Sequence, residues 1–269
     1  MTERFFQRCC WAFAASWCAL VASAPATAQT SEVVDLPSRP GVTQRMLLIT
    51  PAEVKATVVL LVGGHGGLQL SSQGRASWGN NNFLARTAQD FAAQQLAVAL
   101  VDAPSDRQTP PYLSGFRQTA EHAEDLKAVM AHLRQRYGKP VLLVGTSRGT
   151  QSAGAAALAL QGGGGPDGLV LTSSILTDSG GRALTRMPLE NLTIPVLAVH
   201  HEQDACRHCR FSDFPAMTTK IKSPLKVLTY RGGNDVGEPC EAMAYHGFNG
   251  LEAQVVNDIG AWIRQTVAR

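Results

Sequence analysis

The segment VGTSRGT at residues 144–150 places a serine hydroxyl, Ser147, between Gly145 and Gly149. An apolar run (141–144) precedes it and a small-residue stretch (152–160) follows it, which predicts a buried strand that turns sharply into a helix. Such a turn strains the backbone of its central residue and leaves no room for side chains two positions away, so glycine is needed on both sides. The G-x-S-x-G pattern therefore predicts a nucleophilic serine on a tight strand-to-helix turn.

A nucleophilic serine needs a general base, and the base expected here is His246. It lies in AYHGFNG (244–250), between the last strand-like segment and the final helical pattern, where Gly247 and Gly250 allow the loop to fold over the sheet. The other histidines lie in less suitable segments. These are His65 in a glycine-rich loop, His122 and His132 in a long helical pattern, His200 and His201 at a strand end, and His208 in a cysteine-bracketed loop.

Two aspartates follow predicted strands and could orient this base. Asp204 follows IPVLAVHH, and Asp178 follows GLVLTSSI. We favour Asp204, partly because Cys206 lies two residues after it and Cys240 lies six residues before His246. If the acid and base loops touch, the two sulfurs come close together.

A Cys206–Cys240 disulfide would fix the acid loop to the base loop and leave Cys209 as an odd thiol. Closing a loop of about 35 residues contributes about 4 kcal/mol in the chain-entropy description. The alternative is a Cys206–Cys209 pair, a C-x-x-C that would suggest redox chemistry or, with His208, a metal site. We expect no metal.

The glycine-rich segment GGHGGL (63–68) directly follows the apolar run TVVLLV. We expect it to form an oxyanion loop in which the backbone N–H of His65 pairs with that of Arg148. One alternative is a simple tight turn. The other is a phosphate-binding loop, but the Lys-Ser/Thr pair that such a loop requires does not follow this segment.

Several further residues could border the site. Trp78 and Asn80–Asn82 could line its pocket, and the Arg148 side chain could meet a substrate carboxylate, although a solvent-facing role is expected for it. Asp102 and Asp106 are expected in a surface turn.

The N-terminus has the pattern of a secretory signal peptide. Two arginines precede an apolar stretch, and Ala26-Thr27-Ala28 offers a cleavage site. The apolar stretch is shorter than the roughly 20 residues of a membrane anchor, so we expect export to the periplasm or the medium with no stable anchor. Cleavage after residue 28 removes three of the six cysteines and lowers the net charge from +3 to +2. This modest charge, without basic blocks, argues against a nucleic-acid partner.

The rest of the chain alternates strand-like and helical patterns, which predicts a doubly wound, mostly parallel α/β sheet with helices on both faces. We expect a loose lead-in at 29–42 and one α/β domain with a minimal lid at 43–269. The predicted strands are continuous apolar runs at 45–49, 57–62, 96–101, 140–145, 168–174, 194–200 and 226–230. Apolar helical stripes run over 83–91, 116–133 and 251–263.

Together, the glycine-rich loop, the Ser147 motif, Asp204 and His246, in this chain order, resemble the α/β-hydrolase superfamily. The chain is most similar in size to dienelactone hydrolases but carries Ser where they carry Cys. The resemblance implies an α/β-hydrolase fold and a serine esterase with a Ser-His-Asp mechanism, a small-molecule acyl substrate and no cofactor; the signal-peptide pattern adds that this esterase is exported. The alternatives are a hydrolase or transferase acting on a thioester or peptide, a catalytically silent binding protein, and a cysteine-based redox or metal protein. The acyl chain, the leaving group and the oligomeric state stay open.

Overall fold

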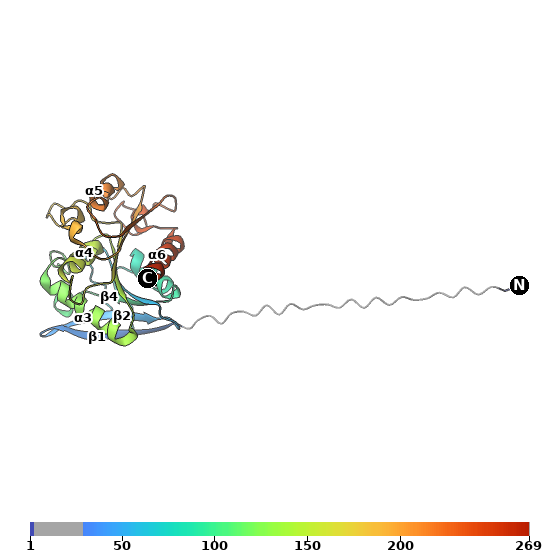
Figure 1. Ribbon diagram of the computed structural model, residues 1–269, viewed down its shortest axis with the longest axis horizontal. Helices are drawn as coiled ribbons and strands as arrows, with labels where there is room; N and C mark the ends of the chain where they lie inside the picture. The colour runs from blue at the N-terminus through green and yellow to red at the C-terminus, as the bar shows by residue number, and fades with distance from the viewer. Residues whose placement is uncertain (3–28, 269) are drawn as a thin grey trace.

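The computed structural model describes residues 1–2 and 29–268, so the predicted signal peptide (1–28) lies outside the described residues apart from its first two. An eight-stranded sheet runs through the domain in the order β1-β2-β4-β3-β5-β6-β7-β8 (Figure 1). Only β2 runs against the others. The strands are β1 (Thr30–Arg39), β2 (Val42–Thr50), β3 (Ala56–Leu61), β4 (Leu96–Val101), β5 (Val141–Thr146), β6 (Gly168–Thr172), β7 (Val196–His201) and β8 (Leu225–Tyr230).

The predicted fold class is confirmed, and every strand-like run predicted above lies on one of the strands β2 to β8. Strands β3 to β7 are buried along their whole length, which explains their continuous Val, Leu and Ala runs.

The expectation of a loose lead-in at residues 29–42 is wrong. Thr30–Arg39 forms β1, which pairs antiparallel with β2 through a turn at Gly41, where φ is +72°. The strand lies at the sheet edge and is largely exposed, so it carries no continuous apolar run. Its stability comes from ladder hydrogen bonds and from contacts with a helix, which composition does not reveal.

Helices cover both faces of the sheet (Figure 1). One core lies between the sheet and α3, α4 and α5, and the other lies between the sheet and α1, α2 and α6. The helices are α1 (Phe83–Arg86), α2 (Ala88–Ala93), α3 (Ala120–Tyr137), α4 (Gly149–Ala159), α5 (Phe214–Thr218) and α6 (Glu252–Val267), with short 3₁₀ turns between them. No helix within the described ranges is long and apolar enough to cross a membrane.

Helix boundaries differ from the predicted stripes at two places. The 83–91 stripe is divided into α1 and α2 at Thr87, whose hydroxyl bonds back to the Phe83 carbonyl. The long stripe starts as a helix only at Ala120, where the Thr119 side chain accepts the His122 N–H. Local side-chain hydrogen bonds therefore set these boundaries.

His122, on α3, is buried. It is 2% exposed, and neither ring nitrogen has a hydrogen-bond partner among the described residues. Burial, with the charges of Arg117 and Arg39, lowers the pKa of His122 to about 3. The imidazole is therefore neutral in the folded protein at any pH near neutrality.

We predict that His122→Phe makes the protein more resistant to acid. Below pH 6.5 the unfolded chain protonates His122 while the folded protein does not, so wild-type stability falls by about 1.4 kcal/mol per pH unit down to about pH 3. Phenylalanine fills the same space without buried nitrogens. In urea unfolding between pH 7 and pH 4, the free energy of unfolding of the variant should increase relative to that of the wild type as the pH falls. A difference in unfolding free energy between the variant and the wild type that does not change with pH would contradict this interpretation.

Candidate active site

Ser147 lies immediately after β5, on the turn that leads into α4. Its φ is +51°, in the left-handed region that side-chain-bearing residues rarely adopt. The backbone N–H of Ser147 donates to the Thr172 carbonyl (3.1 Å) at the end of β6, which fixes the turn to the sheet. The hydroxyl is therefore presented at the carboxyl edge of the central strands, where ligands of doubly wound sheets bind.

The glycines of the Ser147 motif are required by close packing. A Cβ on Gly145 would lie 2.6 Å from the Gly149 carbonyl oxygen, and a Cβ on Gly149 would lie 1.9 Å from the Leu61 carbonyl oxygen. A Cβ on Gly63, in the neighbouring loop, would lie 2.8 Å from the Ser147 Cβ. The motif thus packs the turn against the end of β3 and the glycine-rich loop.

The structure brings His246 and Asp204 together. His246 Nδ1 lies 2.9 Å from Asp204 Oδ2, and both side chains are buried. The other carboxylate oxygen, Oδ1, accepts the backbone N–H of Cys206 (2.9 Å). A carboxylate bonded to Nδ1 leaves Nε2 free to exchange a proton with a partner on the other side of the ring.

A disulfide between Cys206 and Cys240 joins the loop of Asp204 to the loop of His246. Cys206 is buried, whereas Cys240 is exposed. The acid is thus held from two directions by Cys206, through its amide and through its sulfur.

Two further contacts hold the His246 loop. The buried Ser173 hydroxyl donates to the His246 carbonyl (2.7 Å). The Arg86 guanidinium donates to the Gly247 carbonyl (2.6 Å) and to the Asn81 carbonyl (2.5 Å). The Arg86 side chain therefore connects the histidine loop to the segment before α1.

His200 packs beneath the acid without replacing His246. Its Nε2 lies 2.7 Å from the Cys209 carbonyl oxygen and 3.7 Å from Asp204 Oδ2. Burial lowers the pKa of His200, so the ring is neutral and Nε2 carries the proton donated to the carbonyl.

The alternative acid, Asp178, has other partners. It accepts hydrogen bonds from Gly180 (2.7 Å) and Gln151 (3.1 Å) and lies near Arg182 (3.4 Å) and Arg148 (3.9 Å). Burial opposes its charge, but the two hydrogen bonds and two arginines together lower the pKa of Asp178. Its ion pair also accounts for the half-exposed Arg148 side chain.

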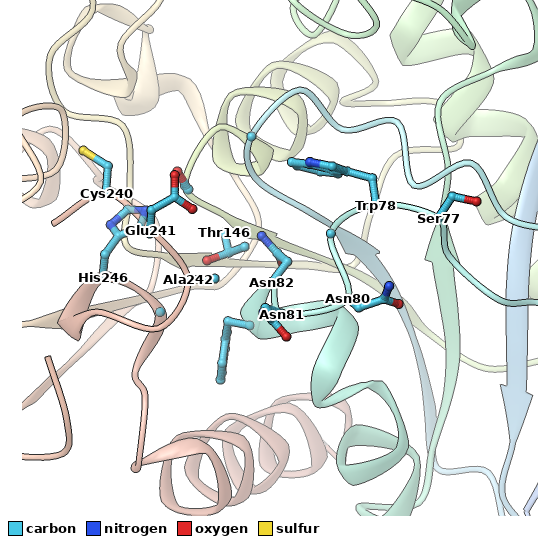
Figure 2. Close-up of a pocket in the computed structure, with 15 residues that line it drawn as sticks. Ser77, Trp78, Asn80, Asn81, Asn82, Thr146, Cys240, Glu241, Ala242 and His246 are labelled. Atoms are coloured by element: carbon cyan, nitrogen blue, oxygen red, sulfur yellow. The ribbon is translucent and has the colours of Figure 1, made fainter. Parts of the chain in front are cut away.

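Ser147 and His246 both line one cavity of about 590 Å³, a volume within the range typical of small-molecule sites. Among the described residues, no hydrogen bond joins the Ser147 hydroxyl to the His246 ring. Figure 2 shows His246, Cys240 and Glu241 on one side of the cavity and Trp78 with Asn80–Asn82 on the other. Trp78 and the three asparagines, named from the sequence as possible lining residues, thus do line it.

The glycine-rich loop is shaped by a buried arginine that the sequence analysis did not identify, Arg117. Its guanidinium donates to the carbonyls of three consecutive residues, Val62 (3.1 Å), Gly63 (3.4 Å) and Gly64 (3.2 Å), and to the Ser152 hydroxyl (2.9 Å). Burial lowers the pKa of Arg117 to about 9, and the nearby Arg148 charge acts in the same direction. The guanidinium still carries its charge at neutral pH.

These carbonyls determine where the loop's N–H groups point. A trans peptide directs its C=O and N–H to opposite sides, and the Gly64–His65 peptide is trans. Because the Gly64 carbonyl faces Arg117, the His65 N–H points away from Arg117. Left-handed angles at Gly64 (+56°) and Gly66 (+82°) permit this arrangement, which resembles an anion-binding nest.

The His65 imidazole is a packing group. It lies between Trp78 (ring centroids 3.6 Å apart) and Tyr112 (4.1 Å), and its Nδ1 accepts the Gly67 N–H (3.1 Å). Burial, with the Arg117 charge, lowers the pKa of His65, so the ring is neutral.

Asp102 is buried, and the expectation of a surface turn is wrong for it. Its carboxylate is 2% exposed and accepts the backbone N–H groups of Leu68 (2.7 Å) and Leu70 (2.8 Å), among others. It therefore fixes the chain just after the glycine-rich loop. Asp106 is partly exposed and pairs with Arg39.

Cys209 is a buried free thiol near this site. One ligand atom each of Cys206, Cys209 and His246 lie within 4.8 Å of one another, which resembles a metal-binding set. However, Cys206 is in a disulfide and cannot supply a thiolate, and burial raises the pKa of the Cys209 thiol well above its usual value. Cys209 is thus a packing residue.

Structure comparison is informative where sequence comparison is not. No protein-family model and no curated relative matches this chain. An α/β serine hydrolase homologue from Coxiella burnetii is 17% identical, with a TM-score of 0.61 over 86% of this chain and 96% of its own. A dienelactone hydrolase from Anabaena variabilis is 13% identical, with a TM-score of 0.61 over 88% and 98%. The chain has the α/β-hydrolase fold.

A third similar structure is carboxyl esterase 2 from Tuber melanosporum, at 14% identity and a TM-score of 0.63 over 91% of this chain and 89% of its own. The α/β-hydrolase fold accounts for the position of Ser147 at the end of β5 and of Asp204 beyond β7, at the carboxyl edge of the sheet.

We predict that removing the disulfide destabilises the protein far more than removing the free thiol. The disulfide spans 34 residues, and its loss in Cys206→Ala/Cys240→Ala should cost about 4 kcal/mol of unfolding free energy. Cys209→Ala, the control, leaves the disulfide in place and should cost on the order of 1 kcal/mol. Urea unfolding followed by circular dichroism measures both. Equal losses would argue against a stabilising crosslink.

Proposed function

We propose that this chain is an exported serine hydrolase that cleaves carboxylic esters through an acyl-enzyme intermediate. The observation that carries the proposal is the arrangement at one cavity of Ser147, on a strained turn, and His246, bonded to the buried Asp204. Nucleophile, base and orienting acid come from three loops at the same edge of the sheet.

In the first step, His246 Nε2 accepts the Ser147 proton as Oγ attacks the ester carbonyl. Asp204 holds the Nδ1–H tautomer and stabilises the imidazolium that forms. The imidazolium then protonates the alcohol leaving group. In the second step, water gives a proton to His246 and its oxygen attacks the acyl carbonyl. The imidazolium then donates this proton to Ser147 Oγ as the acyl C–O bond breaks, which frees the carboxylic acid and restores both Ser147 and neutral His246.

The oxyanion formed in each step requires N–H donors, which we assign to His65 and Arg148. The assignment of His65 is supported by its peptide geometry, since Arg117 holds the Gly64 carbonyl and the His65 N–H points away from the guanidinium. Arg148 is the N-cap of α4, so its backbone lies at the positive end of the helix dipole. One such donor typically contributes about 3 kcal/mol to transition-state stabilisation.

Hydrolase activity is also the activity named for similar structures, which include esterases and a dienelactone hydrolase. Export is supported by the signal-peptide pattern at residues 1–28 and by a disulfide, which persists in oxidising compartments such as the periplasm.

We predict that Ser147→Ala abolishes ester hydrolysis. The purified protein should cleave p-nitrophenyl acetate and react covalently with a fluorophosphonate probe at Ser147, and the variant should lose both, with kcat at least 10³-fold lower. Ser72→Ala, at an exposed serine outside the cavity lining, is the control and should match the wild type. Lack of labelling in the wild type would indicate a silent binding protein. Labelling with cleavage only of thioesters or aminoacyl amides would overturn the ester assignment.

We predict that Arg117→Met lowers kcat by about 10²-fold with a smaller effect on KM, because it releases the carbonyls that orient the oxyanion donors. Arg117→Lys retains the charge but not the planar fork, so it should recover only part of kcat. Arg210→Met, at an exposed arginine, is the control. Circular dichroism separates this effect from unfolding. A folded Arg117→Met variant with wild-type kcat would contradict the role.

A further inference from the structure

We infer that the ester cleaved at this site is carried by a polyhydroxylated ring, a short-chain acyl ester of a carbohydrate. The inference rests on the proposed hydrolase function and extends it to the substrate class. It follows from the cavity wall opposite His246, where an indole face and a run of side-chain amides lie together.

Trp78 is built as a flat platform. Its ring packs on His65, which packs on Tyr112, so three rings form a stack that ends at the cavity. The indole edge also lies against Gly64, where a Cβ would be 2.4 Å from the ring. Figure 2 shows the indole edge-on, with one face turned toward the part of the cavity where Asn82 and Thr146 lie. A fixed, half-exposed aromatic face suits the C–H face of a sugar ring.

The asparagines next to this platform offer complementary hydrogen-bonding groups. Asn82 Oδ1 accepts the Leu84 N–H (3.2 Å) at the start of α1, which leaves its Nδ2 as a donor. Asn80 Nδ2 donates to the Ala76 carbonyl (3.0 Å), which leaves its Oδ1 as an acceptor. The Asn80 amide can thus accept a hydrogen bond from one substrate hydroxyl, and the Asn82 amide can donate a hydrogen bond to a neighbouring hydroxyl.

These groups are held in place by the protein. Arg86 binds the Asn81 carbonyl on this wall and the Gly247 carbonyl on the histidine wall, so the two sides of the cavity are connected. On the histidine wall, Glu241 follows the disulfide residue Cys240 and lines the cavity. Its carboxylate adds a further acceptor for hydroxyls and disfavours anionic substrates.

The lining offers little to an apolar acyl chain. Apart from Trp78, the lining contains one large apolar side chain, that of Phe83, and this residue is only 1% exposed. A long acyl chain would therefore leave the amides unpaired, which costs binding free energy. The volume of about 590 Å³ suits a single sugar ring with a small acyl group.

The first test compares two esters of similar ring size, a monoacetylated methyl xylopyranoside and cyclohexyl acetate, with the full mature protein. We expect kcat/KM to be at least about 10-fold higher for the sugar ester, because only its hydroxyls pair with the amides. A ratio near or below 1 for these two alkyl esters overturns the inference. Activity on p-nitrophenyl acetate with fluorophosphonate labelling would then still support the proposed function.

Asn82→Asp tests the amide directly. It keeps the oxygen that caps α1 and removes the Nδ2 donor, so the ratio of kcat/KM for the sugar ester to that for cyclohexyl acetate should fall from about 10 to near 1. Asn191→Asp, at an exposed asparagine outside the cavity, is the matched control and should leave the ratio unchanged. An unchanged ratio in Asn82→Asp argues against a hydroxyl contact there.

A binding measurement in Ser147→Ala makes the inference independent of turnover. After residue 28 the chain contains two tryptophans, Trp78 and the buried Trp262. Titration with the sugar ester should quench the Trp78 fluorescence, whereas cyclohexyl acetate should not. Trp78→Phe, which keeps an aromatic face, should retain a measurable preference for the sugar ester in the hydrolysis assay, and Trp78→Leu should lose it. Equal quenching by both esters contradicts the inference.

Discussion

The close approach of three backbone segments at the end of β5 is the constraint on which the site depends. Gly149 packs so tightly on the last residue of β3, and Gly145 on the first turn of α4, that neither position has room for a Cβ. This packing forces Ser147 into its left-handed angle and places its side chain against Gly63 of the glycine-rich loop. The cost of the strained angle is offset by burial of the strand ends around it.

The proposed acid and base, Asp204 and His246, come to the same cavity from elsewhere in the chain. Asp204 and His246 lie 42 residues apart in sequence, on loops that follow β7 and β8. Two buried polar groups are stable only when both are paired and their loops cannot separate. The disulfide, the Cys206 amide and the Ser173 hydroxyl supply these restraints from three sides. The disulfide and the Ser173 hydroxyl act on the two loops, whereas the Cys206 amide binds the Asp204 carboxylate itself.

What the sequence predicts well in this protein is what leaves a local pattern. The continuous apolar runs predicted β3 to β7, because strands buried on both faces need apolar residues throughout, and shorter apolar runs also marked the partly buried β2 and β8. The glycine spacing predicted the Ser147 turn, because sterics allow nothing else there. The edge strand β1 was missed, because an exposed strand held by ladder hydrogen bonds has no such run.

Polar residues with long-range roles were missed for a different reason. Asp102 resembles any aspartate after a strand, yet it is buried because backbone N–H groups of a separate loop converge on it. His122 shares the stripe of α3 with polar residues, and only its packing against Phe116 reveals its burial. The partners of Asp102 lie more than 30 residues away in the sequence, and the burial of His122 depends on tertiary packing, so no local pattern contains either role.

Arg117 is the extreme case, and its chemistry suits the oxyanion role proposed for the glycine-rich loop. Three carbonyl oxygens that point the same way create a region of negative potential inside the protein, which is unfavourable unless a cation occupies it. The guanidinium satisfies all three with one planar group. With the carbonyls turned inward, the N–H groups must point outward, and the buried positive charge behind them strengthens their pull on a negative oxygen at the cavity. The same interaction therefore satisfies the interior and prepares the site.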